Sequence, residues 1–195
     1  IRRFEAESGI PVVHVWHPDD GFRKTEIVNR AILAADGDYL IFVDGDCIPR
    51  ADFVATHARL AEPGTYLAGG AIKLPRDVSE RITPDDVRAG RATDLAWLRA
   101  QGWRPGKHAF RLIPGGPIPA ALDRLTGRSA KWRGGNSSAW RADIERVNGY
   151  DNDMGYGGED RALGERLVNA GVRARKIRYR APAVHLDHGR PYNDP

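Results

Sequence analysis

Two carboxylates one residue apart follow an apolar run, and this pair is the first feature of the chain that could do chemistry. The run covers residues 39–43, and the pair is Asp44 and Asp46. Close carboxylates repel each other and are costly to remove from water unless a cation neutralises them, usually a hard divalent ion with oxygen ligands. A strand that is apolar on both faces is typical of a parallel sheet, whose ligands bind beyond the carboxyl ends of the strands. The pair therefore predicts half of a metal site.

A second acidic pair, Glu159 and Asp160, follows a glycine-rich loop and opens a predicted amphipathic helix that runs to residue 170. Acidic residues in a first helical turn commonly bind free N–H groups and complement the helix dipole, and this capping role is the more frequent one. The same geometry would hold one carboxylate rigidly at the rim of a cleft. Both roles stay open at this point.

Two histidines, His185 and His188, come after a basic strand over residues 173–184 that Pro182 interrupts. In an extended chain the two side chains would point to different sides, so the sequence predicts that they do not bind one ion together. One of them could complete the metal site that the aspartates begin. A histidine in this position is more often an ordinary polar residue.

The elements that position these residues follow from periodicity and turn signals. Residues 11–16 predict a strand, residues 23–35 a helix and residues 39–43 the next strand, which together form one βαβ unit. A helix is predicted near residues 52–60, a strand over 66–74, a glycine turn with small residues over 133–140 and a helix over 142–147. This is a thin sheet, so we expect one domain over residues 1–195 that lacks its first strands.

Residues 75–131 are rich in charged residues, proline and glycine, with weakly amphipathic patches at 87–98 and 118–125. Long connections in compact domains tend to carry function. This stretch predicts an inserted helical lid or an acceptor-binding region.

Composition excludes several classes of protein. The chain has 195 residues of which 41% are hydrophobic, enough for a sizeable core. No apolar run approaches the roughly 20 residues that span a bilayer, and no signal peptide is recognisable. Cys47 has no partner for a disulfide, which agrees with a reducing compartment. The net charge of +4 is interspersed and mostly from arginine, which suits a phosphate-bearing substrate better than nucleic acid.

A set of motifs in one order resembles family 2 glycosyltransferases. The set begins with residues 23–29, Asp44-Gly45-Asp46 and Gly135-Asn136, and continues with Asn148-Gly149-Tyr150-Asp151, Gly157-Gly158-Glu159-Asp160 and His185. The C-terminal part is similar to the β-1,4-galactosyltransferase domain of bacterial members. The resemblance covers most of the chain except residues 75–131, and the order of the motifs is more specific than a lone DxD.

The resemblance implies a GT-A fold, a mixed Rossmann-like sheet flanked by helices, and sugar transfer with inversion from a nucleotide-diphosphate sugar, a UDP-sugar first among them. Asp44 and Asp46 would hold Mn²⁺ or Mg²⁺, with His185 as a further metal ligand and His188 as the fallback. The acceptor would be a glycan or a lipid-linked saccharide. The place of action implied is the cytoplasm, at the inner face of the membrane if the protein makes peripheral membrane contact.

The same resemblance assigns roles to single residues. Arg23 would meet the donor nucleotide, and Asn29 would support it. Asp160 would be the catalytic base and Glu159 an acceptor-orienting carboxylate. The acceptor site would further include Gly135, Asn136 and Tyr156, although related loops usually carry tryptophans where this one has only Tyr156.

Two alternatives compete with the transferase interpretation. A haloacid-dehalogenase-like phosphatase also places DxD after an apolar strand, but it would have Thr or Val where this chain has Ile48. A glycosyltransferase-like domain that binds nucleotide or glycan without turnover is the other. A phosphatase would form a covalent adduct at Asp44, whereas the transferase needs Asp160.

Overall fold

The structure, a computed structural model, describes residues 1–18, 20–113, 117–126 and 129–189. Residues 114–116 and 127–128 of the expected insertion lie outside this set, as do residues 190–195 of the expected domain. The strands are β1 (Tyr39–Phe42), β2 (Cys47–Pro49), β3 (Thr65–Ala68), β4 (Gly70–Lys73), β5 (Ser137–Trp140), β6 (Arg173–Lys176) and β7 (Pro182–His185). The helices are α1 (Arg2–Ser8), α2 (Lys24–Ala34), α3 (Phe53–Leu60), α4 (Arg76–Ser79), α5 (Pro84–Arg88), α6 (Leu95–Ala100), α7 (Pro117–Leu125), α8 (Arg141–Arg146) and α9 (Glu159–Asn169), with 3₁₀ turns at Arg91–Thr93 and Lys107–Leu112.

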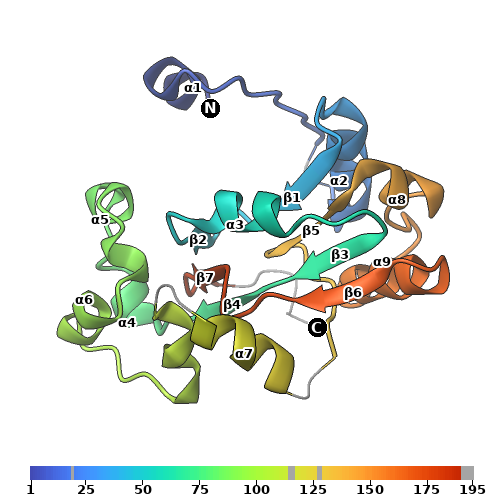
Figure 1. Ribbon diagram of the computed structural model, residues 1–195. Helices are drawn as coiled ribbons and strands as arrows, with labels where there is room; N and C mark the ends of the chain where they lie inside the picture. Colours follow the sequence, from blue (N-terminus) through green and yellow to red (C-terminus); the bar gives the residue numbers. More distant parts are fainter. Residues whose placement is uncertain (19, 114–116, 127–128, 190–195) are drawn as a thin grey trace.

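The described strands form two mixed sheets (Figure 1). The larger has the order β1-β5-β3-β6, with β5 antiparallel to both of its neighbours and β6 parallel to β3. The smaller has the order β2-β7-β4, with β7 antiparallel to β2 and parallel to β4. The chain passes from the larger sheet to the smaller one three times: from β1 to β2, from β3 to β4, and from β6 to β7. The first of these crossings carries the acidic pair.

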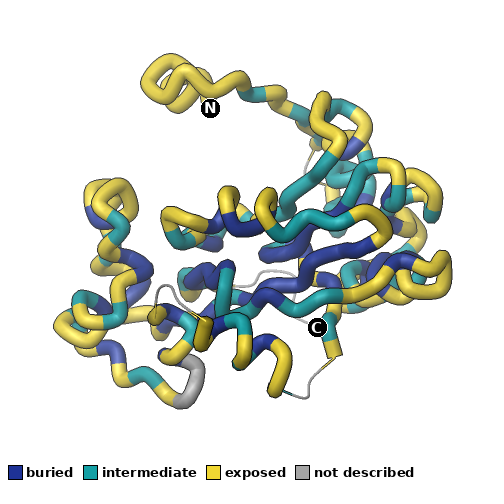
Figure 2. The backbone as a smooth tube through the Cα atoms, viewed as in Figure 1, coloured by how far each residue is buried: buried dark blue, intermediate teal, exposed yellow. Residues whose placement is uncertain are grey.

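Apolar side chains cover both faces of β1. Leu40 and Phe42 pack on the main core, which includes Trp132, while Tyr39 and Ile41 pack on a second cluster around Phe53 of α3. Figure 2 shows the buried stretches concentrated in the central strands. This two-sided cover explains the uninterrupted apolar run.

The expected parallel βαβ unit is wrong, although its helix is confirmed at α2. β1 is antiparallel to β5 and lies at an edge of its sheet as described. Residues 11–16 form no strand and are largely exposed, with Val13 at 65% and Trp16 at 69% exposure. A strand needs a hydrogen-bonded neighbour, and no described strand pairs with this segment. An apolar run indicates that both faces of a strand are buried, but it does not indicate whether the neighbouring strand is parallel or antiparallel.

Two predicted long strands are each divided between the sheets. The predicted strand at 66–74 becomes β3 and β4, and the basic strand at 173–184 becomes β6 and β7. Asn136 fastens this junction, since its Nδ2 donates to the carbonyls of Gly70 (3.2 Å) and Ala181 (2.8 Å). A Cβ on Gly69 would lie 1.9 Å from Asn136 Oδ1, so only glycine leaves room for this amide.

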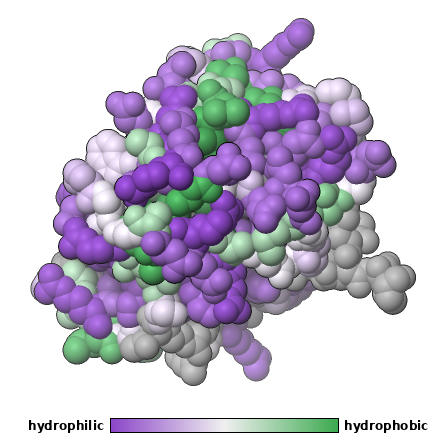
Figure 3. Space-filling view, turned by 90° about the vertical axis from the view of Figure 1, so that its right-hand side faces the viewer, coloured by the Kyte–Doolittle hydropathy of each residue, from purple (hydrophilic) through white to green (hydrophobic). Residues whose placement is uncertain are grey.

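The described part of residues 75–131 is helical and contributes its own cluster. Val78, Leu98 and Trp103 pack against Ile72 and Val184 of the smaller sheet. In Figure 1 the short helices α4 to α7 lie to one side of and below the smaller sheet. No described helix has the length and apolar character needed to cross a membrane. The face seen in Figure 3 is mostly hydrophilic, with hydrophobic side chains gathered in a narrow band.

Candidate active site

The first acidic residue lies between β1 and β2, facing the start of α2. Lys24 Nζ donates to Asp44 Oδ1 at 3.1 Å. Burial lowers the pKa of Lys24, but the charges of Asp44, Asp160 and Glu159 outweigh this effect, and the pKa is raised. The ammonium is therefore charged and is shared by carboxylates from distant parts of the chain.

Asp46 meets both histidines, which corrects the prediction that they diverge. His185 Nε2 lies 3.3 Å and His188 Nε2 2.7 Å from Asp46 Oδ2, and the two rings stack with centroids 5.6 Å apart. β7 ends at His185, and the Leu186 N–H then bonds to the Asp46 carbonyl at 2.9 Å. Strand alternation no longer applies after His185, so His188 returns to the same side.

The three side chains fit a divalent cation. Ligand atoms of Asp46, His185 and His188 lie within 4.8 Å of one another, and Asp46 Oδ1 is buried with no hydrogen-bond partner among the described residues. His188 Nδ1 lies 2.7 Å from the Gly189 carbonyl and must donate to it. In a ring with this single proton, His188 Nε2 carries a lone pair that faces the Asp46 carboxylate oxygen. A cation between these atoms removes the repulsion. Carboxylate with imidazole suits Mn²⁺ better than Mg²⁺, which prefers oxygen ligands and water.

The neighbouring thiol is not suited to bind that cation. Cys47 joins Asp44 and Asp46 in a second group of potential ligand atoms within 4.8 Å. Burial and the nearby charges of Asp46 and Asp44 raise the pKa of Cys47 to about 12. Thiolates select soft metal ions, whereas Mn²⁺ and Mg²⁺ take carboxylate, imidazole and water ligands.

The loop at Gly134-Gly135 brings the second acidic motif to the first. The Gly134 N–H donates to Asp160 Oδ2 at 2.9 Å. A Cβ on Gly135 would lie 2.6 Å from Asp44 Oδ2, and one on Gly134 would lie 3.1 Å from Asp160 Oδ1 and 3.5 Å from Lys24 Nζ. Two adjacent residues without side chains thus allow both carboxylates and the ammonium to approach one short stretch of backbone. The two acidic motifs form one site.

Asp160 is held from two sides. Besides the Gly134 bond, its Oδ1 accepts from the Tyr150 hydroxyl at 3.1 Å, and that hydroxyl accepts from Trp132 Nε1 at 2.7 Å. Burial raises the pKa of Asp160 above its usual value, although the Gly134 N–H, the Lys24 charge and Tyr150 oppose the change. The carboxylate is fixed in orientation and is a stronger base than an exposed aspartate.

Glu159 takes the capping role of the two that the sequence left open. Its Oε2 accepts from the backbone N–H groups of Gly157 (3.0 Å) and Gly158 (2.8 Å), so it ties down the loop that precedes α9. Burial raises the pKa of Glu159, but the bonds from the backbone outweigh it and the pKa is lowered. Glu159 is an ionised loop anchor, while Asp160 reaches out of its helix to the Gly134 loop.

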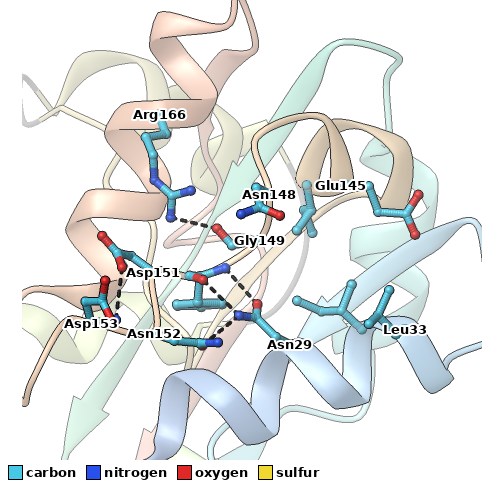
Figure 4. Close-up of a pocket in the computed structure, with 12 residues that line it drawn as sticks. Asn29, Leu33, Glu145, Asn148, Gly149, Asp151, Asn152, Asp153 and Arg166 are labelled. Carbon is cyan, nitrogen blue, oxygen red and sulfur yellow. Dashed lines mark hydrogen bonds between the residues drawn. The ribbon is translucent and has the colours of Figure 1, made fainter.

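Asn29 acts on Asp160 through Tyr150. Its side chain donates to the Tyr150 carbonyl (2.8 Å) and accepts from the Tyr150 N–H (2.7 Å), as Figure 4 shows. Gly149, at φ 60°, lets Asn29 approach, since a Cβ there would lie 2.4 Å from Asn29 Oδ1. Asn29 therefore fixes the turn that supplies the Tyr150 hydroxyl. The expected role of Asn29 in supporting a donor nucleotide stays a prediction.

The same turn borders a hollow of about 770 Å³ that holds none of the clustered acids. Its lining includes Asn29, Glu145, Asp151 and Arg166. Arg166 donates to the carbonyls of Val147 (2.5 Å) and Gly149 (2.6 Å), so its charge stabilises the end of α8. The polar groups drawn in Figure 4 mostly bind one another, and the clustered carboxylates described above do not line this hollow.

The other predicted site residues are placed as follows. Arg23 donates to Glu26 Oε2 at 2.9 Å from the residue before α2, and its contact with a nucleotide stays a prediction. Tyr156 is 52% exposed and packs edge-to-face on Phe22 at 5.5 Å, and its contact with an acceptor stays a prediction. Asn136 is 1% exposed and bound to protein partners, so its side chain cannot reach an acceptor in this arrangement.

A buried polar chain continues from Asn136. Because its Nδ2 donates, its Oδ1 accepts from His57 Nε2 at 3.2 Å, and His57 Nδ1 then accepts from the Ser138 hydroxyl at 2.7 Å. Burial lowers the pKa of His57 to about 4, so this histidine is neutral. The network fixes β5 and the loop before it, which carries Gly134 and Gly135.

Sequence reasoning missed Lys24 and Tyr150. Lys24 had a usable signal, because a cation in the first turn of a helix opposes the dipole and needs carboxylates elsewhere to hold it. Tyr150 was only part of a helix-ending turn, and nothing in its local sequence connects its hydroxyl with a residue in α9.

Comparison with known proteins agrees with the geometry. Residues 2–113 match glycosyl transferase family 2, and residues 121–189 match the family described as N-terminal domain of galactosyltransferase. No curated protein sequence matched the chain.

Two solved structures share the fold at low identity. A mannosyltransferase from Pyrobaculum calidifontis in complex with GDP-Man and Mn²⁺ has a TM-score of 0.57 at 17% identity, covering 98% of this chain and 44% of its own. GalNAc-T7 with UDP, GalNAc and Mn²⁺ has a TM-score of 0.56 at 13% identity, covering 96% of this chain and 34% of its own. This chain thus spans less than half of either protein, and the likeness establishes the GT-A fold. With the match over residues 2–113, the protein belongs to glycosyl transferase family 2.

Proposed function

We propose that this domain transfers a sugar from a nucleotide-diphosphate donor, a UDP-sugar first among them, to a hydroxyl of a glycan or lipid-linked saccharide. The observation that carries the proposal is the single cluster in which a candidate cation site adjoins a buried carboxylate. Asp46 lies two residues from Asp44, and Asp44 and Asp160 both approach the Gly134-Gly135 backbone. Donor activation and acceptor activation need this adjacency.

The donor side of the cluster would hold the diphosphate. Asp46, His185 and His188 would bind the divalent ion, with Asp44 contributing an oxygen or meeting the donor. An ion bound there supplies positive charge against the negative charge that grows on the departing diphosphate. Lys24 adds a fixed cation on the same side and neutralises Asp44 when no donor is present. That the two similar structures hold Mn²⁺ with a nucleotide or nucleotide sugar supports Mn²⁺, with Mg²⁺ as the alternative.

The acceptor side would remove a proton. An alcohol is a poor nucleophile, and a positioned base that accepts its proton during attack contributes about 10²–10⁴-fold. Asp160 has the raised pKa and fixed orientation that this role requires, while Glu159 keeps the loop with Tyr156 in place. One base suffices for a single displacement with inversion, whereas a covalent route would need a nucleophile as well.

The test is a panel of nucleotide sugars, measured for Mn²⁺-dependent binding and for transfer or slow hydrolysis. Asp46→Ala is expected to lose the metal-dependent part of nucleotide binding, because it removes the carboxylate that both histidines contact. The matched control is Asp36→Ala, an exposed aspartate in the loop after α2. Equal metal-dependent binding by both variants would reject the proposed cation site.

The panel also decides between the proposal and its alternatives. Metal-dependent nucleotide binding without product for any donor and acceptor would identify a non-catalytic binding domain. The phosphatase alternative has lost its support, because both family matches are to glycosyltransferases.

A further inference from the structure

A pocket of about 400 Å³ on the open side of β4 gathers four cationic side chains. Lys73, Arg111, Arg133 and Arg178 line it together with Trp103, and no acidic residue is among the described residues that line it. This volume is within the range of small-molecule sites. Most other arginines with described ion pairs contact a carboxylate three or four residues away on the same helix. A group of described charged residues that are all cationic is therefore unusual on this surface.

Two of these arginines meet over a glycine. A Cβ on Gly70 would lie 3.6 Å from both Arg111 Nη1 and Arg178 Cγ, so both side chains cross the same point of β4. Arg111 also lies 5.8 Å above the Tyr179 ring, and Arg178 donates to the Ser129 carbonyl at 3.1 Å. Arg111 Nε is buried with no hydrogen-bond partner among the described residues. A buried donor without a partner is costly, and an anion that accepts from Arg111 Nε would relieve this cost.

The pocket adjoins the proposed reaction centre by two connections. Arg133 directly precedes Gly134, whose N–H holds Asp160. Lys73 is in register with His185 on the parallel strand β7, so the two side chains leave the same face of the smaller sheet. Arg111 and Trp103 come from the stretch 75–131.

We propose that this pocket binds a phosphoryl group, and that in the transfer reaction this group belongs to the acceptor. The second part rests on the proposed function. Three guanidinium groups and an ammonium match the double charge of a phosphate better than a single carboxylate, and the planar arginine fork fits its oxygens. The pocket would thereby select a phosphorylated acceptor and hold a hydroxyl near Asp160.

The first test titrates inorganic phosphate into the full chain by calorimetry. Arg111→Gln is expected to weaken phosphate binding about tenfold or more, since it removes a charge-assisted donor pair. Arg133→Gln, a change at an exposed side chain, is a second variant that does not depend on buried packing. Arg99→Gln, an exposed arginine of α6 outside the pocket, is the control. Thermal unfolding checks that all variants fold, and equal affinity in all three would overturn the proposal.

The second test separates an acceptor phosphate from the donor diphosphate. Phosphate is titrated again after saturation with UDP and Mn²⁺, and binding is expected to persist. Displacement of phosphate by UDP would place the pocket in the donor site and overturn the assignment to the acceptor. Tighter binding of glucuronate than of phosphate would overturn the choice of a phosphoryl group. Phosphate binding that Arg111→Gln abolishes, in a protein that transfers no sugar, would support the pocket while rejecting the proposed function.

Discussion

The carboxylates at the two ends of the site are treated differently by the fold. Asp46 has one oxygen shared by two imidazoles and one buried oxygen without a hydrogen-bond partner among the residues that the structure describes. Asp160 has both oxygens occupied, one by the Gly134 N–H and one by the Tyr150 hydroxyl. An arrangement that is incomplete without a ligand suits binding, whereas one that is already satisfied suits a group whose orientation must be set before the substrate arrives.

The largest effect should come from Asp160→Asn, which removes the charge but keeps the shape. We expect the transfer rate to fall about 10²–10⁴-fold, because the variant cannot accept the acceptor's proton. Nucleotide binding with Mn²⁺ should be unchanged, as the cation site lies at the other end. Glu165→Gln, an exposed change on the same helix, is the control, and single-turnover transfer with a parallel binding titration is the measurement. A variant that keeps wild-type turnover would remove Asp160 from the mechanism.

A smaller effect is expected where the two ends touch. Gly135→Ala would bring a Cβ to 2.6 Å from Asp44 Oδ2, so the carboxylate must move. Displacements of about 1 Å at a reacting site cost about 100-fold in rate, and we expect a loss of this order together with weaker Mn²⁺-dependent nucleotide binding. Gly155→Ala has open space around the new Cβ and is the matched control. Equal transfer rates for the two alanine variants would show that Asp44 does not need its present position.

The local elements of this site could be predicted, but their meeting could not. Helices α2, α3, α8 and α9 were expected within one or two residues, because amphipathic spacing and glycine turns are local signals. The division of residues 66–74 into two sheets depends on Asn136, which is far along the chain and fills the space over Gly69. No periodicity within the segment contains that information.

The histidines illustrate the same limit. Strand alternation correctly describes residues up to His185, where β7 ends. His188 then returns to Asp46 because the Leu186 N–H bonds to the Asp46 carbonyl, a contact across most of the sequence. Alternation holds only while the ladder continues, and the end of the ladder is set by tertiary contacts.

A third prediction concerns the cation between the two ends. Lys24→Gln removes a charge that lowers the pKa of Asp160, so this pKa should rise further. A base must be ionised to act, and activity is lost as the pH falls through its pKa. The acidic limb of kcat/KM should therefore move to higher pH, by about one unit. Lys131→Gln, at an exposed position, should leave the limb in place, and an unmoved limb in Lys24→Gln would separate the ammonium from the base.

The smallest expected effect is that of Glu159→Gln on stability, which tests whether Glu159 anchors the loop. Its lowered pKa means that the ionised form stabilises the fold above the unfolded-state pKa near 4.3, and that this contribution is lost as the pH falls through the folded-state value. Glu159→Gln should cost about 1 kcal/mol of unfolding free energy at pH 7, because the two glycine N–H groups lose a charged acceptor. The difference from the wild type, measured by urea unfolding, should shrink as the pH falls from about 5 toward 3.

The same variant distinguishes a loop anchor from a second base. If Glu159 only holds the Tyr156 loop, Glu159→Gln should raise KM for the acceptor a few-fold and change kcat by no more than a few-fold. The glutamine amide oxygen can still accept from both N–H groups. A loss in kcat as large as that of Asp160→Asn would place Glu159 among the reacting groups. The distinction between a satisfied carboxylate that orients the loop and one that takes the proton would then no longer hold at this end of the site.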